Sequence, residues 1–158
     1  MFYAALKTIH LLSIIVWIGG MVFAHFFLRP AVAKLEAPER VRLMHDVLGR
    51  FFNAVLIAAG LVLATGTWMI GRMARQMVQA GVKFNMPIEW MVMALLGVVM
   101  VAIFGHIRFA LYKRLTNAVT AAAWPAGGAA LASIRLWVSI NLVIGVVIVA
   151  VTLFGASS

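Results

Sequence analysis

Apolar residues occur in four long runs that are separated by shorter polar segments. The runs cover about residues 2–28, 51–70, 88–111 and 136–154. About 20 apolar residues of α-helix, rising 1.5 Å each, span the roughly 30 Å hydrocarbon core of a bilayer. Backbone N–H and C=O groups in lipid must be bonded within their own segment, which favours helices. We therefore predict an all-α integral membrane protein, a four-transmembrane-helix bundle forming a single domain over residues 1–158.

The polar segments refine these boundaries. Pro38 and Glu39 suit the first turn of a helix, so the second helix is expected to begin in water, before its apolar run. Residues 121–130 are small and contain Pro and Gly, which predicts a loop. Residues 31–33 resemble a signal-peptidase site, but the preceding apolar run of about 22 residues exceeds a signal peptide's hydrophobic region, and we interpret it as a retained first span.

Composition supports lipid as the solvent. Hydrophobic residues make up 65% of the chain and charged residues 11%, more apolar surface than a soluble domain of this size can bury. The net charge of +9 does not indicate nucleic-acid binding, because the basic residues lie at the ends of the apolar runs. The absence of cysteine excludes disulfides, thiolate metal sites and cysteine catalysis.

The basic residues also predict an orientation. Nine of them lie in or beside the first and third connecting segments: Arg29, Lys34, Arg40, Arg42, Arg50, Arg108, Lys113, Arg114 and Arg135. Four lie on the other side: Lys7, Arg72, Arg75 and Lys83. Because Lys and Arg accumulate in cytoplasmic loops, we expect a multi-pass protein of the bacterial inner membrane with both termini in the periplasm.

Histidines within the spans are the first candidates for chemistry, since polar groups in lipid are costly. His10 and His25 lie fifteen residues apart on the first span, which places them about 60° apart on the helix and about 22 Å apart along it. His106 lies at the depth of His25 on the antiparallel third span. The pattern predicts a haem iron held by His25 and His106, with Trp17 placed to stack on a macrocycle. Arg135 is interpreted as an anchor of the fourth span at the cytoplasmic interface, or alternatively as the partner of a haem propionate.

His10 needs a different partner near the outer surface. Met91 lies at its depth on the third span, and Met69 lies at a similar depth on the second. Thioether sulfur favours Cu(I), so His10 with Met91 or Met69 predicts a copper ion or a second haem. The alternative is structural: the histidines bond across the bundle and the methionines fill gaps. His45 is interpreted as solvated, or otherwise as a proton carrier.

Particular motifs also carry a family resemblance. They are Lys7-Thr-Ile-His10, Trp17-Ile-Gly19-Gly20 and Phe27-Leu-Arg29-Pro30 in the first span, then Trp90, His106, Arg135, Asn141-Leu142 and Gly145. This pattern resembles the CopD-like (copper resistance D) membrane family, whose superfamily includes the HemJ-type protoporphyrinogen oxidases. The resemblance implies a four-helix bundle that binds haem b, and the family name implies copper handling.

The chain departs from the HemJ-type enzymes in two places. Those enzymes carry a lysine early in the third helix, where this sequence has Ala94 beside Met93. They also carry an Asn-Glu-Val-Pro motif at the fourth helix, which is absent after Arg135. Neither Ala94 nor Met93 can act as a lysine does, which argues against porphyrinogen oxidation.

The first hypothesis is therefore a b-type haem protein with one or two haems and an electron-transfer or redox function. Copper binding or transport is the alternative, and a HemJ-like oxidase is a further one, so whether the protein is an enzyme stays open. Small residues in every span offer helix-packing surfaces, and we expect a homodimer in membrane lipid with an unidentified redox partner.

Overall fold

A computed structural model describes residues 1–83 and 85–155 of the chain. The helices follow in the order α1 (Phe2–Phe23), the π-helical segment η1 (Ala24–Leu28), α2 (Arg29–Val32), α3 (Ala37–Gln79), α4 (Ile88–His106), the π-helical segment η2 (Ile107–Leu111), α5 (Tyr112–Thr120) and α6 (Trp124–Gly155). The described residues contain no strand. Since α1, η1 and α2 are continuous, as are α4, η2 and α5, the elements form four long helices.

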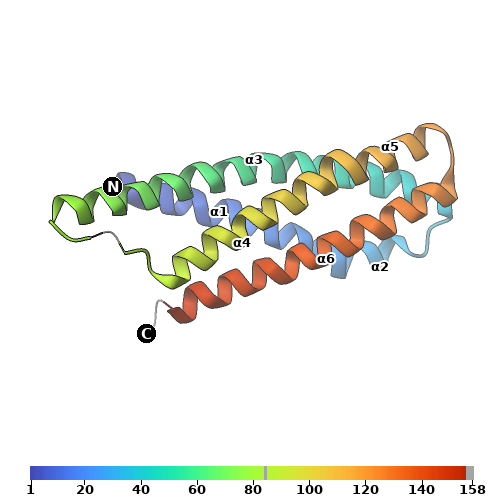
Figure 1. The fold of residues 1–158 in the computed structure, drawn as a ribbon. Helices are drawn as coiled ribbons and strands as arrows, with labels where there is room; N and C mark the ends of the chain where they lie inside the picture. Colours follow the sequence, from blue (N-terminus) through green and yellow to red (C-terminus); the bar gives the residue numbers. More distant parts are fainter. Residues whose placement is uncertain (84, 156–158) are drawn as a thin grey trace.

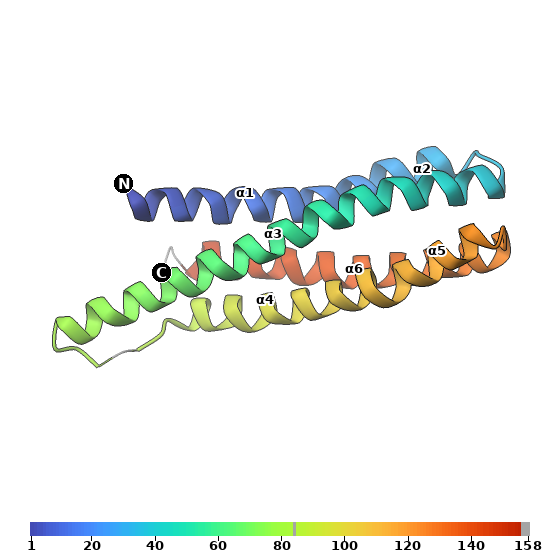
Figure 2. The ribbon, with the colours of Figure 1, turned by 90° about the horizontal axis from the view of Figure 1, so that it is seen from above.

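All four helices are long and apolar enough to cross a membrane: Phe2–Val32, Ala37–Gln79, Ile88–Thr120 and Trp124–Gly155. The predicted four-span, all-α fold is thereby confirmed. The 43-residue α3 is about 65 Å long at 1.5 Å per residue, twice the hydrocarbon thickness. It begins at Ala37, as the Pro38 signal predicted, and projects beyond its neighbours at its Gln79 end (Figures 1 and 2).

The bundle consists of two antiparallel helix pairs. Helix α1 packs along α3, α4 packs along α6, and α6 also contacts α1 and α3. Helices α1 and α4 therefore lie diagonally opposite each other (Figure 2). The N-terminus and the end of α6 lie at the same end of the bundle as the α3–α4 connection, and α2 and α5 lie at the other end (Figure 1).

Aromatic rings fill the centre, where the diagonal helices meet. Trp17 of α1 meets Phe104 of α4 edge-on, with 5.7 Å between ring centroids. Phe52 of α3 meets the same ring at 6.1 Å. All three side chains are buried, so this layer closes the bundle between its two ends.

The predicted loop over residues 121–130 is wrong from Trp124 onward. Helix α6 already begins at Trp124, and only residues 121–123 connect it to α5. Pro125 lies in the first turn of α6, where a missing N–H leaves no hydrogen bond unmade. The alanines that follow are strong helix formers, so the small residues extend the helix instead of interrupting it.

Pro30 gives a local reason for the π-helical segment in the first helix. Its ring nitrogen cannot donate to the carbonyl of Phe26, four residues earlier. Segment η1 lies just before Pro30 and contains both Phe26 and His25. A widened π turn at this point lets the helix continue through the proline.

Two adjacent glycines of α6 give a test of the packing. A Cβ on Gly127 would lie 2.7 Å from Cγ1 of buried Val41, whereas a Cβ on Gly128 meets nothing within 4 Å. We expect G127A to destabilise the protein by about 1–3 kcal/mol through overpacking. G128A, the control, should be neutral or stabilising by up to about 1 kcal/mol. Thermal unfolding in detergent measures both, and equal shifts would contradict this packing.

Candidate functional site

His10 is held against α3 by a hydrogen bond with Thr65. Its side chain is buried, and its Nδ1 lies 2.8 Å from Oγ1 of Thr65. The Thr65 hydroxyl donates its single proton to the Leu61 carbonyl, 2.5 Å away, so it accepts from the imidazole. Neutral His10 therefore carries its proton on Nδ1 and its lone pair on Nε2, the form in which imidazole binds a metal.

A small apolar cavity of about 160 Å³ adjoins this imidazole. Its lining includes one histidine, one tryptophan, two methionines and two closely packed glycines: His10, Trp17, Met93, Met100, Gly66 and Gly145. A Cβ on Gly66 would lie 3.4 Å from Cε1 of His10, so the glycine lets the ring rest against α3. A Cβ on Gly145 would lie 3.3 Å from the methyl carbon of Met100. Glycines thus leave room for both the imidazole and the thioether.

The methionines beside His10 differ from those predicted. Met91 is 52% exposed on the outside of the bundle, and neither Met91 nor Met69 lines the cavity. Met93 and Met100 line it instead. They are seven residues apart and share one face of α4, whereas Met91 and Met100 differ by nine residues and face opposite ways. The seven-residue spacing of Met93 and Met100 is visible in the sequence. The prediction missed it because it paired methionines with His10 by their depth in the membrane alone.

The two histidines predicted to share an iron contact different sides of α6. Nδ1 of His25 lies 3.3 Å from Oγ of Ser139, and the ring of His106 packs edge-on against Trp137 at 5.3 Å. Trp137 and Ser139 are two residues apart and so point about 200° apart around the helix. Helix α6 therefore separates His25 from His106, and the structure does not bring them together.

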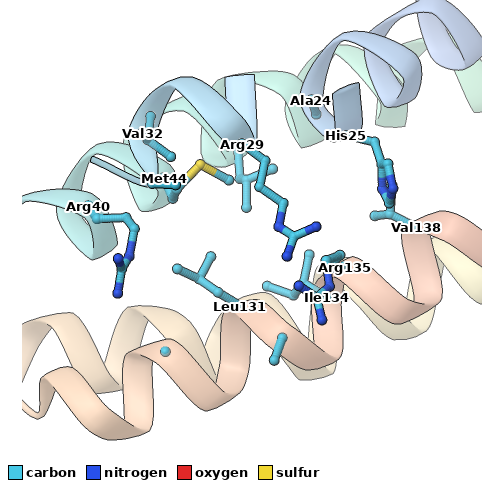
Figure 3. Close-up of a pocket in the computed structure, with 14 residues that line it drawn as sticks. Ala24, His25, Arg29, Val32, Arg40, Met44, Leu131, Ile134, Arg135 and Val138 are labelled. Carbon is cyan, nitrogen blue, oxygen red and sulfur yellow. The ribbon is translucent and has the colours of Figure 1, made fainter. Parts of the chain in front are cut away.

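His25 and Arg135 instead line a second, larger pocket of about 270 Å³. Figure 3 shows this pocket between α2, the first turns of α3 and α6, with Arg29 and Arg40 completing its basic lining. Arg135 was predicted to pair with a haem propionate, and its position beside His25 is as expected. The pocket and the His10 cavity share no lining residue.

His45 connects two helices instead of facing water alone. Its Nε2 lies 3.1 Å from Oγ1 of Thr116, and its Nδ1 lies 3.1 Å from Oδ1 of Asp46. Its ring stacks on Tyr112, with centroids 5.2 Å apart. These contacts join α3 to α5. Among the described residues, no three His, Asp or Glu side chains gather as a metal site.

The hydrogen bond that orients His10 gives a spectroscopic prediction. In T65V the oxygen that accepts from Nδ1 is lost, so the fraction of the Nδ1–H tautomer should fall. Histidine-selective ¹⁵N NMR measures the tautomer, and H10Q assigns the signal. T67V is the control. Thr67 lies on the same helix and lines the cavity, but its hydroxyl bonds only backbone carbonyls of α3. An unchanged tautomer ratio in T65V would contradict the assignment.

A known protein family matches most of the chain. The family model of copper resistance protein D (CopD) matches residues 45–154, from the first turns of α3 to the end of α6. Searches of curated proteins and of solved structures gave no match. The matched region is more than half of the chain and includes three of its four long helices. The chain therefore belongs to the CopD family of copper-related membrane proteins.

Proposed function

We propose that this protein binds copper as Cu(I) inside the bundle, at His10, as part of copper handling at the bacterial inner membrane. The observation that carries the proposal is the hydrogen bond between Nδ1 of His10 and Thr65, which leaves Nε2 for a metal, together with a cavity lined by His10 and two thioethers. His10, Met93 and Met100 would be the ligands. Membership of the CopD family supports copper as the cargo.

The chemistry of the lining favours Cu(I) over other ions. Imidazole and thioether are soft, uncharged ligands, and such sets select Cu(I). No Asp or Glu lines the cavity, so Mg²⁺ and Ca²⁺ would lack the oxygen ligands they require. A single positive charge also costs less to bury in an apolar site than a double charge.

The dimensions of the cavity favour an ion over a macrocycle. Its volume of about 160 Å³ is below the roughly 300 Å³ at which pockets for organic ligands begin. The pair proposed for a haem iron, His25 and His106, lies on two sides of α6. Both observations support our preference for copper over haem b and its electron-transfer role.

The distribution of charge supports an orientation for the site. The end of the bundle that carries α2 and α5 holds the larger set of Lys and Arg residues defined above, which favours the cytoplasm. The termini would then lie in the periplasm. His10 lies early in α1, so copper would be bound in the periplasmic half of the membrane.

Copper loading of purified protein tests the site. The protein in detergent is titrated with Cu(I) against a chromogenic Cu(I) chelator, and bound copper is measured by elemental analysis. We expect about one copper per chain and loss of binding in H10A. In M100L the affinity for Cu(I) should fall on the order of tenfold, because one of the ligands that bind the ion directly is lost. M91L is the control, because Met91 lies outside the cavity.

Three results would contradict the proposal. One is a Soret band in protein purified from haem-replete cells that disappears in H10A. Another is full copper binding by H10A. The third is an equal loss of affinity in M91L and M100L, which would show nonspecific thioether binding. H10Q, which retains a hydrogen-bonding group toward Thr65, provides a second variant if H10A does not fold, and size-exclusion chromatography checks both.

A further inference from the structure

The larger pocket contains an unusual concentration of positive charge. Three arginines line it, Arg29 of α2, Arg40 of α3 and Arg135 of α6, together with His25. Figure 3 shows the guanidinium groups of Arg29 and Arg135 extending toward each other across the pocket. The rest of the lining is apolar, including Met44, Leu131 and Val138.

No carboxylate balances these charges. The lining includes no Asp or Glu, and the ion pair found among the described residues joins His45 to Asp46 elsewhere. Two guanidinium groups that face each other across a pocket repel, and the repulsion is stronger near lipid than in water. Each also presents several N–H donors in a planar fork that matches a phosphate. An anion between Arg29 and Arg135 would remove the repulsion and accept these hydrogen bonds.

We propose that this pocket binds the phosphate group of an anionic phospholipid. Three features favour a lipid. The pocket opens between helix ends at the end of the bundle richest in Lys and Arg, where anionic lipids concentrate. Its apolar lining suits the glycerol and the first carbons of an acyl chain. Basic pockets between transmembrane helices bind lipid headgroups in general.

The site is independent of the copper proposal. It shares no lining residue with the His10 cavity, and the ring layer of Trp17 and Phe104 separates the two. A bound lipid would connect Arg29 of α2 to Arg135 of α6. Its structural effect would be to hold the first and fourth helices together.

The test compares two double variants of the full-length protein. R29Q/R135Q removes the facing pair, and R50Q/R114Q removes two exposed arginines from the same end of the bundle that do not line the pocket. Delipidated protein is titrated with short-chain phosphatidylglycerol, with phosphatidylcholine, and with inorganic phosphate. Native mass spectrometry counts bound lipid, and thermal unfolding measures stabilisation. Size-exclusion chromatography and the unfolding temperature measured without added lipid serve as the folding control.

We expect phosphatidylglycerol to bind the wild type and R50Q/R114Q alike, and R29Q/R135Q at least about tenfold more weakly, because charge-assisted hydrogen bonds to phosphate are lost. Phosphatidylcholine should bind more weakly than phosphatidylglycerol. Equal loss in both double variants would overturn the proposal, because it would indicate a diffuse surface potential. Equal stabilisation by inorganic phosphate would overturn the lipid assignment and identify a site for free phosphate.

Discussion

A hydrocarbon solvent offers polar groups no hydrogen-bond partners, so each polar side chain in the bundle depends on the helices themselves. Thr65 donates to the carbonyl of Leu61, and Ser139 donates to that of Arg135, each one turn earlier. Once its proton is used in this way, a hydroxyl can only accept. His10 lies against Thr65 and His25 against Ser139, so the backbone sets which nitrogen of each imidazole is protonated.

Asn141 departs from this rule. It is buried in α6, and its Oδ1 has no hydrogen-bond partner among the described residues. An unsatisfied buried acceptor costs about 1–3 kcal/mol, which a purely structural position would not need to bear. Asn141 lies one turn before Gly145, which lines the His10 cavity. The uncompensated polar atom is therefore close to the proposed site, where strain is tolerated for function.

Hydropathy could predict the number of spans but not the face that each helix turns inward. Leu and Val suit lipid and a bundle core equally well, so in a membrane the polarity of a helix does not mark its buried side. Depth along the helix was predictable from the polar ends, which placed His10 and Met91 at one level. Rotation was not, and the inward methionine is Met100, on the opposite side of α4. The same uncertainty joined His25 to His106, although α6 lies between them.

The closed centre of the bundle limits what the proposed copper site at His10 could do. Trp17 lines the cavity on one side and packs on Phe104 on the other, and Phe52 completes the ring layer. All three side chains are buried, and Phe104 contacts both of the others. Close-packed interiors resist local displacement. The described conformation is thus closed between the two ends of the bundle. Passage of an ion toward Arg29 and Arg135 would require Trp17 and Phe104 to leave their packed positions, so transport would need a second conformation of α1 against α4.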